Sequence, residues 1–94
     1  MENIKQGQPI ILKITRNVDE EVSFATFINE TKTDMGYYAL HLSNIVTKVG
    51  EHYTFCRSNV IAMTKNVTYK PLDNSQQSVY KSFIKYFNNL IKLL

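Results

Sequence analysis

The spacing of apolar residues changes once along this chain of 94 residues, close to Pro71. Before that point apolar and polar residues alternate, as in QPIILKITR at 8–16, and a period of two is typical of half-buried strands. After it, in SVYKSFIKYFNNLIKLL at 78–94, apolar residues recur every three or four positions, which is the period of an amphipathic helix. The chain therefore predicts a mainly β fold followed by one helix.

Further strands are expected at 21–28, 36–46, 52–56 and 59–70, the last as one strand or two short ones. Turn-forming residues separate them at 17–20, 29–36 and 48–51. Because these links have hairpin lengths, we expect a small five-stranded antiparallel barrel or a strongly bent sheet over about residues 8–70. A flat sheet crossed by the helix is the alternative.

The helix is expected over about residues 75–93. Asp73 and Gln76 have the spacing of a capping box, and Lys92 suits the negative end of the helix dipole. We expect the apolar side of this helix to cover the open side of the sheet. The alternative is that it docks on a protein partner or a membrane surface, and its few cations favour the protein.

The length is that of a single domain, 1–94, with one thin core. Its lone cysteine, Cys56, excludes an internal disulfide and a cysteine zinc cluster, so a reducing cytoplasm is the expected location. The N-terminus lacks the pattern of a secretory signal. No apolar run approaches the roughly 18 residues of a membrane span, and we expect no membrane partner.

Catalytic and metal-binding patterns are weak. His41, His52 and Cys56 are the only soft ligands, whereas a zinc site needs about four converging groups. Cys56 lies in an apolar run, which favours a buried and inert thiol. The acidic residues fall mainly in turns, and three glycines make no phosphate-binding loop. We therefore expect no metal, no cofactor and no enzymatic activity.

One polar step interrupts the alternation in TFCRSNVIAM at 54–63. Arg57, Ser58 and Asn59 suit a corner at which a strand bends sharply from one half of a barrel into the other. An arginine on such a corner presents forked donors to a phosphate or a base edge, with Asn59 beside it. The alternative is that Arg57 pairs with a surface carboxylate and Asn59 bonds within its own turn.

The stretch from Phe55 to Ile61 resembles the second signature of the Sm-like small β-barrel family, in which an apolar residue precedes Arg-Gly; here Ser58 replaces the glycine. The resemblance covers about residues 7–64. It implies a ring of six or seven subunits that binds single-stranded RNA through Arg57 and Asn59, joined by Asn29 or Tyr37. A sheet followed by a C-terminal helix is also similar to the Whirly type of single-stranded DNA-binding protein.

Charge and aromatic content lead to two functions. Eleven basic against eight acidic residues give a net charge of +3, which suits an anionic partner. Strand tyrosines beside Lys48 or Arg57 would form a stacking platform for unpaired bases, although a core position is the alternative for most of them. We expect a nucleic-acid-binding module that self-associates and contacts single-stranded RNA or DNA through Arg57, Asn59, Tyr37, Asn29 and Lys48. The alternative is a small protein-binding module or inhibitor of phage type, which acts on a host protein through a strand edge or the terminal helix.

Overall fold

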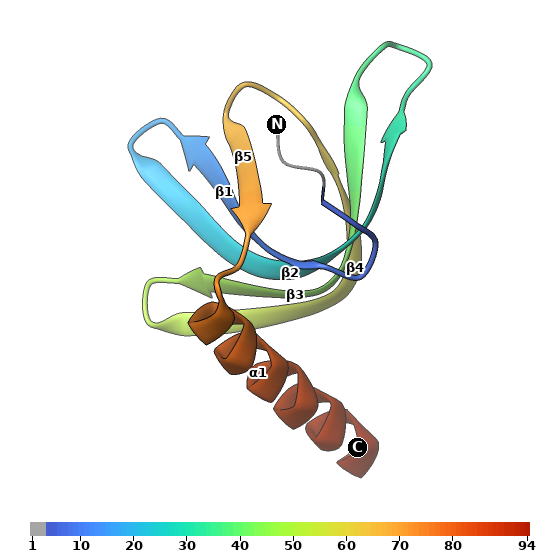
Figure 1. Ribbon diagram of the computed structural model, residues 1–94. Helices are drawn as coiled ribbons and strands as arrows, with labels where there is room; N and C mark the ends of the chain where they lie inside the picture. The colour runs from blue at the N-terminus through green and yellow to red at the C-terminus, as the bar shows by residue number, and fades with distance from the viewer. Residues whose placement is uncertain (1–3) are drawn as a thin grey trace.

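The computed structural model describes residues 4–94, which form a five-stranded antiparallel sheet and one helix. In chain order these are β1 (Pro9–Arg16), β2 (Asp19–Lys32), β3 (Tyr38–Val49), β4 (His52–Ala62), β5 (Val67–Pro71) and α1 (Asn74–Leu93) (Figure 1). The strand order is β4-β3-β2-β1-β5, so the first four strands form a meander and β5 returns beside β1. The predicted bent antiparallel sheet with a C-terminal helix is confirmed. Within the described residues β4 and β5 do not pair, and the sheet is not closed.

The sheet bends into a cup because the pairing of β2 with β3 is irregular (Figure 1). Its register shifts between Phe24 and Thr26 and shifts back between Phe27 and Asn29. The first shift leaves an extra residue on β3, beside Asn44, whose φ of 51° is in the left-handed region. Such bulges bend a strand and increase its twist. Asparagine tolerates this conformation better than most residues.

Strand β4 changes face once along its length. Phe55 packs in the cluster beneath the helix, whereas Ile61 packs in the cluster inside the cup. In a regular strand two odd-numbered residues point to the same face. The change occurs near Arg57, which lies opposite the left-handed Asn44 because the residues on either side pair in an unchanged register. The predicted corner is therefore an irregular point within one continuous strand.

The inside of the cup, which we call the inner face, holds the larger core. Its buried members come from β1, β2, β3 and β5: Ile10, Leu12, Ala25, Phe27, Leu40, Leu42, Ile45 and Val67. Burying a large aliphatic side chain stabilises a fold by about 1.5–3 kcal/mol. This cluster is therefore the main source of stability for the sheet.

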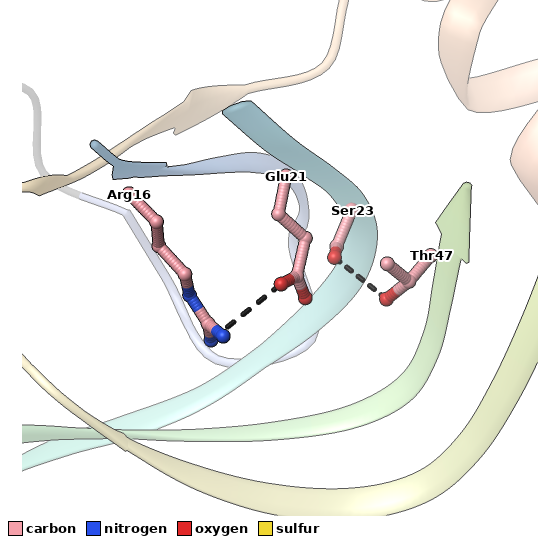
Figure 2. Close-up of polar contacts among 4 residues, drawn as sticks. All are labelled: Arg16, Glu21, Ser23 and Thr47. Atoms are coloured by element: carbon pink, nitrogen blue, oxygen red, sulfur yellow. Dashed lines mark hydrogen bonds and ion pairs between the residues drawn. The ribbon is translucent and has the colours of Figure 1, made fainter. Parts of the chain in front are cut away.

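The inner face becomes polar towards the β1–β2 turn (Figure 2). The buried hydroxyls of Ser23 and Thr47 lie 2.7 Å apart and satisfy one another across paired strands. Nearby, the Arg16 guanidinium lies 3.5 Å from the Glu21 carboxylate. Because Arg16 is largely exposed, this ion pair contributes little to stability.

Strand β2 is longer than the sequence predicts. The polar residues 29–32 were expected in a loop, but they pair with β3, and the loop is confined to 33–37. Cross-strand contacts support the extension: the Thr31 hydroxyl lies 2.9 Å from Nε2 of His41. The ends of β2 and β3 therefore form an arm that rises beyond the core (Figure 1).

The helix begins with the predicted capping box. The Gln76 backbone N–H donates to the Asp73 side chain at 2.8 Å, and the Asp73 N–H donates to the Gln76 side chain at 3.1 Å. These bonds satisfy two of the donors that a helix start leaves unpaired. Lys92 lies in the last turn, as expected for the helix dipole.

The part of α1 that extends to Phe87 packs on the outer, convex face of the cup (Figure 1). Tyr80 is 2% exposed, and its hydroxyl donates to the Asn44 carbonyl at 2.7 Å. Further along, Phe87 stacks on Phe55 of β4 with ring centroids 4.9 Å apart. The last turn runs beyond the sheet and ends at the strongly exposed Leu93. The expected cover over the sheet is therefore provided by only part of the helix.

Candidate nucleic-acid interface

Arg57 and Asn59 are both exposed on β4, which is an edge strand. No carboxylate of residues 4–94 forms an ion pair with Arg57. The side-chain oxygen of Asn59 accepts a hydrogen bond from the Val60 N–H at 2.8 Å. The alternative of local bonding is therefore observed for Asn59, whereas the surface carboxylate expected for Arg57 is not seen among the described residues.

Asn29 and Tyr37 lie at the arm formed by β2 and β3. Tyr37 is in the loop before β3, is 55% exposed, and donates its backbone N–H to the Thr33 hydroxyl at 3.1 Å. Asn29 is exposed on β2 and pairs with His41. Because His41 alternates with residues of the inner core, this pair lies on the outer face.

Lys48 lies at the opposite end of β3 from Tyr37. Its ammonium group is 5.9 Å from the centre of the Tyr53 ring, within the range of a cation–π contact. The five residues predicted to bind nucleic acid therefore occupy three separate places: the middle of β4, the arm, and the β3–β4 hairpin.

A cavity of about 640 Å³ lies at the open seam of the sheet, and we call it the seam pocket. Its lining includes Glu30 of β2, Tyr38 of β3, Met63 after β4, and Tyr69 and Lys70 of β5. Ligand pockets typically enclose 300–1,000 Å³. Sequence reasoning missed this site because its residues come together only where the bent strands approach β5. The alternation of apolar and polar residues did predict that Tyr38 and Tyr69 lie on strands.

A hydrogen bond joins two polar side chains of the seam pocket. The Tyr69 hydroxyl donates to Oε2 of Glu30 at 3.2 Å. Burial raises the pKa of Tyr69, and the negative charge and hydrogen bond of Glu30 raise it further. The hydroxyl therefore stays protonated at neutral pH and keeps its donor directed at the carboxylate.

A cation and an aromatic ring lie next to each other near this pocket. The Lys32 ammonium is 6.0 Å from the centre of the Tyr38 ring, which is itself 50% exposed. Exposed rings accept stacked bases, and ammonium groups pair with phosphates. The arm therefore carries both kinds of group that single-stranded nucleic acids contact.

The expectation of a buried thiol is wrong. Cys56 is exposed, and its sulfur lies 3.1 Å from the Ser58 carbonyl oxygen. It is exposed because β4 is an edge strand whose inner face is not covered at this point.

Over residues 4–94, no group of three or more His, Cys, Asp or Glu side chains is placed to hold a metal ion. Among the same residues, no helix is long and apolar enough to cross a bilayer.

Comparison with known proteins gives no relative: the chain matches no family model, no curated protein and no solved structure. The similarity of residues 55–61 to the Sm-like signature therefore rests on the sequence alone.

Proposed function

We propose that the protein is a non-enzymatic module of the cytoplasm that binds single-stranded RNA or DNA. The observation that carries this proposal is the combination of two exposed rings and one cation, Lys32, on the arm. Tyr37 and Tyr38 are each at least half exposed, and the Lys32 ammonium lies over the second ring. Stacking contributes about 1–3 kcal/mol per base, and cations bind the backbone.

Two further observations support the same proposal. Arg57 projects from an edge strand without a carboxylate partner among residues 4–94. Lys48 and Tyr53 form a second pair of cation and ring at the β3–β4 hairpin. The net charge of +3 adds a general attraction for polyanions.

A second candidate, a protein-binding module of the inhibitor type, is favoured by the end of α1. Leu90 and Ile91 are each 40% exposed, and Leu93 is exposed almost completely. An apolar helix face without a partner is typical of helix-in-groove recognition. Such a module would not respond to a polynucleotide at physiological salt.

Fluorescence anisotropy of labelled single-stranded oligonucleotides, titrated at several salt concentrations, tests the proposal. We expect the logarithm of the binding constant to fall linearly with the logarithm of salt, because phosphate contacts release counterions. The Arg57→Ala variant should weaken binding and reduce the salt slope by about one.

Arg16→Ala is the matched control, because it removes the same charge from a residue that already pairs with Glu21. It should weaken binding less than Arg57→Ala does. A wild-type protein that ignores RNA and DNA oligonucleotides even at low salt would contradict the proposal and favour the protein-binding alternative.

A further inference from the structure

The seam pocket has aromatic residues in its lining. Tyr38 comes from β3 and Tyr69 from β5. The Tyr69 ring also packs beside the Phe27 ring, which is nearly parallel to it at 9°, with centroids 6.4 Å apart. A pocket lined by rings suits a flat aromatic ligand, because stacking rewards planar surfaces.

One carboxylate sets the polar chemistry of this pocket. Glu30 lines the cavity, and the Tyr69 hydroxyl holds its Oε2 atom at 3.2 Å. An ionised carboxylate only accepts hydrogen bonds, so it selects a ligand edge that carries donors. Two neighbouring donors on one edge make the best match, since a carboxylate has two oxygens.

Among the bases, guanine alone presents two adjacent donors on its pairing edge, the N1–H and the N2 amino group. Uracil and thymine present one N–H between two carbonyl oxygens, which a carboxylate repels. Cytosine and adenine present one amino group next to a ring nitrogen that accepts. In a duplex the pairing edge of guanine is occupied, so only an unpaired guanine offers it.

Cations near the pocket suit the backbone of the same strand. Lys70 lines the cavity, and the Lys32 ammonium lies 6.0 Å from the centre of the Tyr38 ring. Neither lysine forms an ion pair with a carboxylate of residues 4–94. A base that stacks on Tyr38 would leave its phosphate near the Lys32 ammonium group.

We propose that the seam pocket binds one unpaired guanine base of a single-stranded nucleic acid, with Glu30 accepting from N1–H and N2–H. This inference rests on the proposed function, and it adds a base preference and a site that differs from Arg57. Glu30, Tyr38 and Tyr69 are the residues that determine it.

The first test uses the wild-type protein and three labelled oligonucleotides of equal length: uridine only, uridine with one central guanosine, and uridine with one central inosine. Inosine lacks the N2 amino group and keeps the N1–H. Anisotropy at a fixed, physiological salt should show about 10-fold tighter binding of the guanosine oligonucleotide than of the uridine one. The inosine oligonucleotide should fall between them.

The second test compares Glu30→Gln with Glu51→Gln, which makes the same charge change at an exposed residue of the β3–β4 turn. Glu30→Gln should reduce the guanosine preference to less than about 2-fold, because an amide no longer supplies two acceptors. Glu51→Gln should keep the preference. Glu51→Gln should also leave the affinity for the uridine oligonucleotide unchanged.

The outcomes separate this inference from the function on which it rests. Equal affinity for all three oligonucleotides in the wild type would overturn the guanine pocket and leave the nucleic-acid-binding function standing. A guanosine preference that Glu30→Gln retains would also overturn it. Failure to bind any of the three at low salt would overturn both. The wild-type comparison needs no variant, so it decides the question even where Glu30→Gln folds poorly.

Discussion

Tyr80 joins the helix to the irregular point of the sheet. Its hydroxyl donates to the Asn44 carbonyl at 2.7 Å and lies 2.8 Å from the Thr26 hydroxyl, which is left as the donor of that second bond. Its ring meets Phe24 edge-on at 6.3 Å. One side chain thus satisfies the backbone at the left-handed residue of β3 and fixes the start of α1.

Removal of the Tyr80 hydroxyl should therefore destabilise the fold. Tyr80→Phe leaves the ring in place and deprives the partly buried Asn44 carbonyl of its donor, so we expect the free energy of unfolding to fall by about 1–2 kcal/mol. Urea denaturation followed by circular dichroism measures the change. Above about pH 10 the variant should also lose stability less steeply than the wild type.

The pH effect follows from burial, which raises the pKa of Tyr80, partly offset by the hydrogen bond from Thr26. The unfolded chain releases this proton near pH 10, whereas the folded chain keeps it to higher pH, so the stability is complete below pH 10 and decreases above it. Tyr37→Phe, in an exposed loop, is the control and should change stability at neutral pH by less than about 0.5 kcal/mol. Equal stability of wild type and Tyr80→Phe would exclude this role of the hydroxyl.

The sequence indicated where β4 is irregular, but it did not indicate the left-handed residue opposite that point. The polar residues at Arg57 interrupt the alternation of apolar and polar residues. In the structure, the side chains of β4 change from one face of the sheet to the other near this residue. Asn44 carries no comparable mark, because an asparagine within a strand pattern also occurs on ordinary exposed faces. Its left-handed conformation arises from the pairing with β2, which local sequence does not encode.

The helix, taken as an element, divides into an attached and an exposed part. Phe87 belongs to the attached part, because it stacks on Phe55 at 4.9 Å. Leu93 belongs to the exposed part. We expect Phe87→Ala to lower the free energy of unfolding by about 2 kcal/mol, through lost stacking and burial. Leu93→Ala should change it by less than about 0.5 kcal/mol.

Chemical denaturation of the two variants side by side measures this difference. Equal and large losses would mean that the end of the helix is packed in solution, against a second copy or against the sheet. Near-zero losses for both would mean that α1 is not held on the outer face by Phe87.

The elements with strong periodicity were predictable, and the arm was not. The capping box at Asp73 and the stripe of α1 depend on residues close in the chain, so sequence spacing specifies them. The polar stretch NETK at 29–32 looks like a loop, since its residues form no core. Only pairing with 38–41 makes it a strand, and the seam pocket depends on that pairing.

In the whole molecule, as far as residues 4–94 show, the sheet has two edge strands without a second neighbour, β4 and β5. Within residues 4–94, β4 pairs only with β3 and β5 only with β1. The edge strand β4 is long and mostly exposed, with Val60 at 54%. Exposed edges invite strand addition, and natural proteins usually protect them with charges, prolines or bulges. In β4, the irregular point at Arg57 is a protection of this kind.

We therefore expect the protein to self-associate through an edge. Light scattering after size-exclusion chromatography should give a defined multiple of the 10.9 kDa chain, in a closed oligomer rather than a broad series. Val60→Lys places a charge on the exposed edge strand and should shift the mass towards that of one chain. Val18→Lys adds the same charge at the β1–β2 turn, where Val18 is 96% exposed, and should leave the mass unchanged.

A mass of one chain at every concentration of the wild-type protein would exclude association through the edges. The arm and the seam pocket would then bind their ligand within one copy of the chain. Arg57 would remain on an unpaired edge strand, β4, to which a strand of a partner protein can also pair.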